Sequence, residues 1–186
     1  MSNFHDTASP ASAAASRPAV FPTAAPANAR TARTRRRLIT AARSVLMDNA
    51  GAAEIGAIAK TAGVSAGLAY HHFGSKDGLI AAVVEDFYAR YARVANARYS
   101  GSGWAEREIQ RTRAVVIFLL EHPFTPTLFG PLSRAPAVMN AEQACMAGLV
   151  DHGARNIAQG QADGDLPRGS DPRLAAAFVL GGMRQA

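Results

Sequence analysis

Residues 55–79, IGAIAKTAGVSAGLAYHHFGSKDGL, are the segment around which the fold of this chain is predicted to be organised. In its first part, apolar residues recur at helical spacing, at Ile55, Ile58, Ala59 and Ala62. Gly63 follows, and glycine adopts the left-handed conformation of a sharp turn without steric cost. The spacing therefore predicts a short helix that ends in a tight turn.

A second helix is expected directly after this turn. Ser65 is a favourable N-cap residue, and Val64 is expected to pack beneath the turn. Ala59 is small, which allows the two helices to cross closely. A scaffold helix, a turn with glycine and a second helix that can lie in the major groove of DNA together make a helix-turn-helix.

An amphipathic helix is expected before the motif, ending at Gly51. Its apolar residues follow the i, i+3, i+4 rule, at Leu38, Ala41, Ala42, Val45 and Leu46. An arginine cluster, which includes Arg35 and Arg36, is expected to lie just before this helix and to contact phosphates or a minor groove. The alternative is a charged run that only faces solvent.

The same region resembles the DNA-binding signature of the TetR/AcrR family of bacterial transcriptional regulators. The matching positions are Ile58, Ala59, Ala62, Gly63, Val64, Ser65, Gly67, Tyr70, Phe73, Ser75, Lys76 and Leu79. The resemblance covers roughly residues 33–85, and the remainder fits the family only as an all-helical chain of suitable length. It implies an all-α fold with an N-terminal three-helix head and a C-terminal helical body.

Two places depart from the family pattern. The family usually has Thr or Ser at the start of the first motif helix, where its hydroxyl caps the helix and reaches a phosphate. Here Ala53 and then Glu54 stand at that place. Leu68-Ala69 replaces the usual Thr-Leu before the tyrosine. These changes affect one expected phosphate contact and the reading of bases, but not the fold.

The residues expected to contact DNA lie on the second motif helix and on both sides of it. They are Arg35, Arg36, Ser65, Ala66, Gly67, Tyr70, His71 and Lys76. Tyr70 and Lys76 are expected to bind phosphates, with Ser75 capping the next helix. Residues 65–72 contain no Arg, Lys, Asn or Gln, the usual partners of base edges. Sequence reading is therefore expected to depend on close fit, DNA shape and the arginines.

The distribution of charge agrees with a duplex-binding head. The chain has a net charge of +6, and residues 30–80 hold eight basic against three acidic side chains, a net +5. Such a concentration of positive charge is typical of DNA-binding segments. The predicted division is a disordered tail rich in Ala, Pro and Ser at residues 1–29, a DNA-binding domain at 30–80, and a regulatory and dimerisation domain at 81–186.

Four further helices are predicted in the body. They are expected at residues 76–98, 104–122, 137–159 and from 172 onward, the last with Asp171 as N-cap and its end cut short. Prolines break up residues 123–136. In the helix at 104–122, an inward-facing side is expected, formed by Ile109, Val116, Leu119 and Leu120.

A ligand cavity in the body is implied by the family resemblance. Its candidate lining residues are Trp104, Phe118, Phe124, Phe129, Met139 and Met146. Ordinary core packing is the alternative for each of these side chains. Nothing in the sequence identifies the ligand.

Other classes of protein find little support in the sequence. No nucleophile motif, carboxylate pair or phosphate-binding loop is apparent, so no catalytic residue and no cofactor is expected. His71 and His72 diverge by about 100° on a helix, so no metal site is expected. No membrane span is expected, and a single cysteine suits the cytoplasm.

The predicted function is that of a sequence-specific DNA-binding transcriptional regulator. Family habit implies a repressor that binds a palindromic operator as a homodimer and is released by a small-molecule effector. The alternative is a protein-interaction module that uses the helix-turn-helix fold without DNA.

Overall fold

The computed structural model describes residues 27–185, which contain eight α-helices and, within this range, no strand. The predicted all-α fold class is confirmed. The predicted tail lies, apart from its last few residues, outside the described residues. The helices are α1 (Ala27–Asp48), α2 (Ile55–Ala62), α3 (Ala66–Phe73), α4 (Lys76–Ala95), α5 (Trp104–Glu121), α6 (Thr125–Phe129), α7 (Pro136–Asp163) and α8 (Pro172–Gln185).

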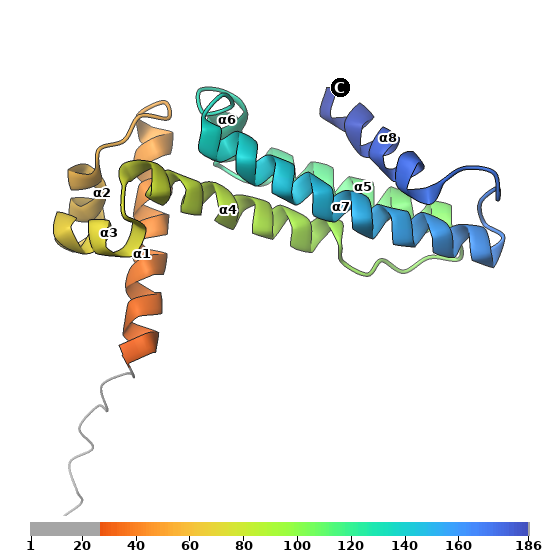
Figure 1. Cartoon of the computed structure of the whole chain (residues 1–186), viewed down its shortest axis with the longest axis horizontal. Helices are drawn as coiled ribbons and strands as arrows, with labels where there is room; N and C mark the ends of the chain where they lie inside the picture. The colour runs from red at the N-terminus through yellow and green to blue at the C-terminus, as the bar shows by residue number, and fades with distance from the viewer. Residues whose placement is uncertain (1–26, 186) are drawn as a thin grey trace, which may run out of the picture.

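Two groups of helices are joined by α4. We call α1–α3 the head and α5–α8 the body. Figure 1 shows the head at one end of the molecule, with α4 running from it along α7, and α8 crossing the far part of α7. Helix α4 thus contacts α1 and α3 in the head and α5 and α7 in the body.

The turn between α2 and α3 forms as the sequence predicts. Gly63 has a positive φ of 64°, and the Val64 N–H donates to the Ala59 carbonyl at 3.0 Å. The Ser65 hydroxyl then accepts from the Leu68 N–H at 3.2 Å, which caps α3. Because α2 closes and α3 opens within three residues, the orientation of α3 is fixed by local hydrogen bonds.

The start of α1 differs from the prediction. The arginine cluster was expected before the first helix, but α1 begins at Ala27, so Arg35 and Arg36 lie within it. Alanine and arginine are both strong helix formers, and their propensity extends the helix beyond its apolar stripe. The arginines are therefore held at fixed helical positions instead of on a free arm.

The joint between head and body is built around Phe87 of α4, whose side chain is fully buried. Its ring lies 4.9 Å from that of His122 and 5.5 Å from that of Phe118, both measured between centroids. Short helix α6, which was not predicted, adds buried Leu128, and its N-cap residue Phe124 is also buried. Its proline lies in the first turn, where a missing N–H costs nothing, so the proline-rich stretch still forms a helix.

The predicted inward-facing side of α5 is wrong for three of its four residues. Leu119 packs partly buried against the core, whereas Ile109, Val116 and Leu120 are exposed. Helix α5 has no buried residue. The start of α8, by contrast, agrees with the prediction, because the Asp171 carboxylate accepts from the Leu174 N–H at 2.7 Å.

Candidate nucleic-acid interface

Helix α3 presents one exposed surface, which we call the α3 face. It consists of Ser65, Ala66, Gly67, Tyr70 and His71, all of which are exposed. On the opposite side, Ala69 is fully buried and holds the helix against the head. The structure therefore brings together the N-cap residue Ser65 and the four α3 residues that the sequence singled out.

Tyr70 projects from this surface instead of packing in the core. Its side chain is 52% exposed. Phe73, one turn further along, packs against the core of the head instead. Because the Tyr70 ring is not buried in the head, its hydroxyl is available as a hydrogen-bond partner for a phosphate.

The junction of α3 and α4 depends on a glycine. The Ser75 hydroxyl accepts from the Gly78 N–H at 3.0 Å and caps α4. A Cβ on Gly78 would lie 2.2 Å from the Phe73 carbonyl oxygen, which is far inside van der Waals contact. Only glycine allows this close approach, which places Lys76, the first residue of α4, beside the end of α3.

Lys76 has a partner that the sequence did not predict. Its Nζ lies 3.5 Å from Oε1 of Glu54, the residue just before α2. Both side chains are exposed. The ammonium expected to bind a phosphate thus already lies against a carboxylate.

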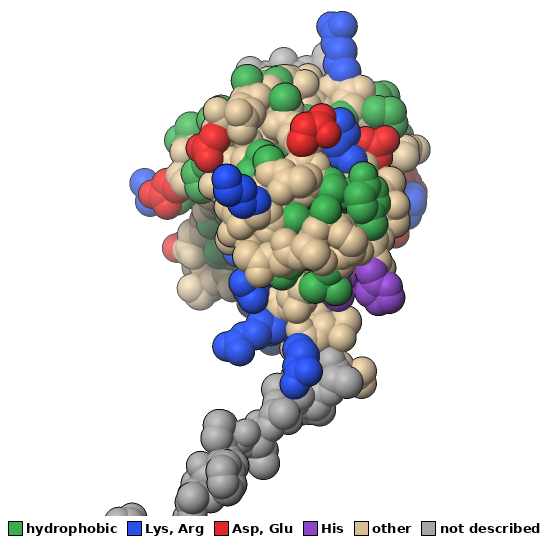
Figure 2. Space-filling view, turned by 90° about the vertical axis from the view of Figure 1, so that its left-hand side faces the viewer, with side chains coloured by type: hydrophobic (Ala, Val, Ile, Leu, Met, Phe, Trp, Pro, Cys, Tyr) green, Lys and Arg blue, Asp and Glu red, His purple; other side chains and the backbone are tan. Residues whose placement is uncertain are grey.

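The arginines of α1 divide into different roles. Arg35 lies with its guanidinium carbon 5.3 Å from the centre of the Phe73 ring, so it is close to the end of α3. Arg37, which the sequence did not single out, donates to the Ala62 carbonyl at 2.6 Å and thereby caps the end of α2. Arg36 is exposed. Figure 2 shows Lys and Arg side chains gathered on the lower part of the head, toward the start of the described chain.

The six candidate ligand residues do not all lie together. Phe118, Phe124 and Phe129 surround Phe87, with ring centroids at 5.5, 6.3 and 6.4 Å from its ring. Trp104 begins α5, about 21 Å along the helix from Phe118. Met139 is exposed and Met146 is half-buried. Three of the six thus form an aromatic cluster at the joint, and the tryptophan lies apart from it.

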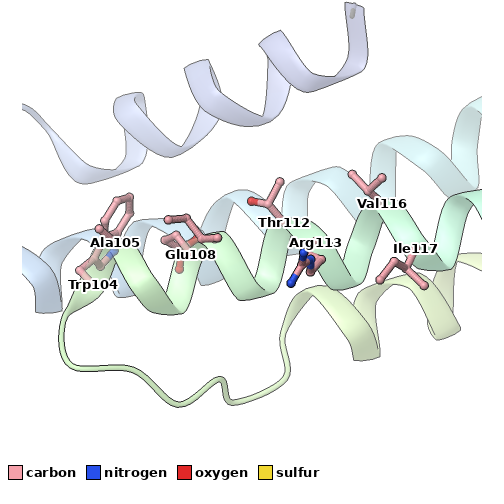
Figure 3. A pocket seen from close by; sticks show the side chains of 8 residues that line it. Trp104, Ala105, Glu108, Thr112, Arg113, Val116 and Ile117 are labelled. Carbon is pink, nitrogen blue, oxygen red and sulfur yellow. The ribbon is translucent and has the colours of Figure 1, made fainter.

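A surface groove of about 710 Å³ follows the exposed side of α5. Figure 3 shows Trp104 at one end and Val116 and Ile117 at the other, with Glu108, Thr112 and Arg113 between them. All its lining residues belong to α5, so it is a groove along one helix. Of the predicted ligand residues, this groove contains Trp104 alone.

Polar side chains connect α5 to α7 in the body. Glu108 accepts from Asn156 at 2.6 Å and also pairs with Arg111. Burial, followed by the charges of Arg111 and Arg155, lowers the pKa of His152. The same physics raises the pKa of the Cys145 thiol, which burial disfavours as a thiolate. The hydrogen bond between Glu108 and Asn156 thus links α5 to α7.

Two classes of site are not found within residues 27–185. No three His, Cys, Asp or Glu side chains in this range lie where they could share a metal ion. No helix of this range is long and apolar enough to cross a lipid bilayer.

Comparison with known sequences finds a family match over most of the head and the start of α4. Residues 38–83 match the family model "Bacterial regulatory proteins, tetR family", and the match includes the turn, the α3 face and Lys76. No curated protein matches the chain.

Solved structures share the fold over most of the chain. A candidate TetR-family transcriptional regulator from Mesorhizobium loti is 22% identical, with 82% of this chain and 79% of that one covered at a TM-score of 0.63. The transcriptional regulator FadR from Bacillus subtilis, solved with stearoyl-CoA, is 19% identical (78% and 81% covered, TM-score 0.62). SmeT, the repressor of the Stenotrophomonas maltophilia efflux pump SmeDEF, is 22% identical (81% and 75% covered, TM-score 0.61). Residues 38–83 thus match the tetR family of bacterial regulatory proteins, and the described chain has the all-helical fold seen in solved regulators of that family.

Proposed function

We propose that this protein is a DNA-binding transcriptional repressor of the bacterial cytoplasm, which binds a palindromic operator as a homodimer. The observation that carries the proposal is the α3 face, an exposed helical surface inside the segment that matches the tetR family. The proposed DNA-binding domain is residues 30–80, and the proposed regulatory and dimerisation domain is residues 81–186. No catalytic activity forms part of this proposal.

Binding is proposed to depend mainly on phosphates. Tyr70 and Lys76 lie at the end of α3 and the start of α4, and each is exposed enough to reach a DNA strand. Ala66 and Gly67 allow α3 to approach the groove closely, because their side chains are small. Arg35 and Arg36, fixed on α1, are proposed to add discrimination through the width of an A·T-rich minor groove.

Release by a small-molecule effector is the proposed control. FadR was solved with stearoyl-CoA and SmeT is a repressor, and both share this fold. Helix α4 contacts helices of both head and body, so an effector that favours one position of α4 can change the spacing of two heads. Helices α7 and α8, which pack together, are proposed to form the four-helix dimer interface with their symmetry mates.

The test is selection of bound fragments from randomised duplex DNA, followed by titration of the selected site against salt. We expect a palindromic site. Lys76→Ala should weaken binding to specific and random duplexes alike and flatten the slope of log K against log salt by up to about one unit. Arg113→Ala, which removes an exposed charge from α5, is the control and should leave the slope unchanged.

Failure to recover any duplex would favour the alternative, a protein-interaction module. A change in sequence preference without a change in slope would contradict the phosphate role of Lys76.

A further inference from the structure

We propose that Glu54 competes with DNA for Lys76 and thereby limits the affinity of the head for duplex DNA. The inference rests on the proposed function and assigns a role to a residue outside the expected contact set. Its basis is the 3.5 Å contact between Glu54 Oε1 and Lys76 Nζ, which joins the start of α2 to the start of α4.

The Glu54 carboxylate is not used to build the head. Glu54 occupies the N-cap position of α2, with φ −117° and ψ 139°, but its side chain makes no capping hydrogen bond. The side chain is 84% exposed. Since an exposed ion pair contributes little to stability, the contact with Lys76 matters more for what approaches this surface than for folding.

The Glu54 carboxylate lies in surroundings that favour negative charge. The first N–H groups of a helix have no partner within it, and the helix dipole favours negative charge there. At α4, the Ser75 hydroxyl accepts one such N–H, that of Gly78, and Lys76 adds a full positive charge. A carboxylate between the starts of α2 and α4 therefore occupies the surroundings that would attract a phosphate oxygen.

Two consequences follow for DNA binding. A phosphate that approaches Lys76 must either displace the carboxylate or lie close to a second negative charge. Either way, Lys76 contributes less to neutralising the strand than a lysine without this partner would. Because phosphate contacts carry no sequence information, Glu54 should weaken binding to every duplex by a similar factor.

The test is Glu54→Gln, which keeps the size of the side chain and removes its charge. Binding to a selected site and to a random duplex is measured by fluorescence anisotropy across a range of salt. We expect the slope of log K against log salt to steepen by up to about one unit, because Lys76 without its carboxylate partner neutralises a phosphate more fully. If wild type and variant converge near about 1 M salt, a full unit corresponds to about eightfold tighter binding near about 0.1 M.

Two further variants make the result specific. Glu85→Gln gives the same change in net charge at an exposed position on α4, about 14 Å along the helix from Lys76, and should leave the slope unchanged. The double variant Glu54→Gln, Lys76→Gln is compared with Lys76→Gln alone. Most of the gain in affinity from Glu54→Gln should be absent in that comparison, because the gain acts through Lys76. Thermal melting of each variant checks that the head still folds.

The competing outcomes are distinct. If Glu54→Gln binds no more tightly than Glu85→Gln, the inference is wrong while the proposed function stands. A gain limited to one DNA sequence would also overturn it, because that would indicate a base contact. If neither wild type nor variant binds any duplex, the proposed function and this inference fail together.

Discussion

In the head, helices α1 and α2 bury their apolar residues against each other and α4, whereas α5 in the body has no buried residue. The same contrast holds for the large apolar side chains that are exposed on the described surface. In the head, Tyr70 is the only such side chain of the described residues. Those on α5 and α8 are Ile109, Val116, Ile117, Leu120, Leu174, Phe178 and Val179. In the head, an exposed aromatic residue thus marks the surface proposed to bind DNA, while in the body exposed apolar groups are too common to mark any one surface.

The difference has a structural origin in the spacing of contacts along the chain. The turn in the head is closed by hydrogen bonds between residues three to five apart, such as Val64 to Ala59. The body is held by contacts between distant segments, such as Cys145 with the Tyr88 carbonyl and Asn156 with Glu108. A local pattern is therefore sufficient for the turn of the head but not for the contacts of the body.

The largest expected effect compares the same substitution in both regions. Leu38 of α1 is fully buried, and Leu38→Ala should lower the free energy of unfolding by about 2–5 kcal/mol, because it leaves a cavity in the core. Leu120 of α5 is 81% exposed, and Leu120→Ala should change the free energy of unfolding by no more than about 0.5 kcal/mol. Urea denaturation followed by circular dichroism measures both. Equal losses would show that the exposed side of α5 is covered in solution.

A smaller effect is expected from adding one methyl group to a glycine. Gly78→Ala should destabilise the protein by about 1–3 kcal/mol, because the Cβ would clash with the Phe73 carbonyl oxygen. Gly148→Ala in α7 should stabilise it by up to about 1 kcal/mol, because a Cβ there meets nothing within 4 Å and alanine is the better helix former. The same denaturation experiment gives both values. A stable Gly78→Ala variant would mean that α3 and α4 separate without cost.

The smallest expected effect is a dependence of the protein's stability on pH, which arises from His122 at the joint of the two regions. Burial, followed by the charges of Arg43 and Arg90, lowers the pKa of His122, and Asp86 only partly offsets this. The Nδ1 atom of neutral His122 accepts from the Phe124 N–H at 3.3 Å, a contact that protonation at that nitrogen would abolish.

The unfolded chain, with a histidine pKa near about 6.5, binds this proton more readily than the folded chain. The stabilisation is therefore complete above about pH 6.5 and is lost as the pH falls toward the lower pKa of the folded state. Melting temperatures across this range should fall less steeply for His122→Gln than for the wild type. If the melting temperatures of wild type and His122→Gln depended on pH in the same way, protonation of His122 would not affect the stability of the joint.

The sequence alone determined the helical class, the turn at Gly63 and the exposed surface of α3. Each depends on residues that are close in the chain, where helix periodicity and capping chemistry leave few alternatives. The predicted N-caps Ser65, Ser75 and Asp171 each accept the expected hydrogen bond for the same reason.

Which sides of the helices are covered, and which charges meet, depends on how the helices pack in the folded chain. The periodicity of α5 shows an apolar side but not what packs on it, so Ile109 and Leu120 were wrongly expected to face inward. Glu54 and Lys76 are 22 residues apart and meet only because α2 and α4 begin side by side in the folded head. Such pairings depend on how whole helices are arranged, and no local pattern in the sequence encodes that arrangement.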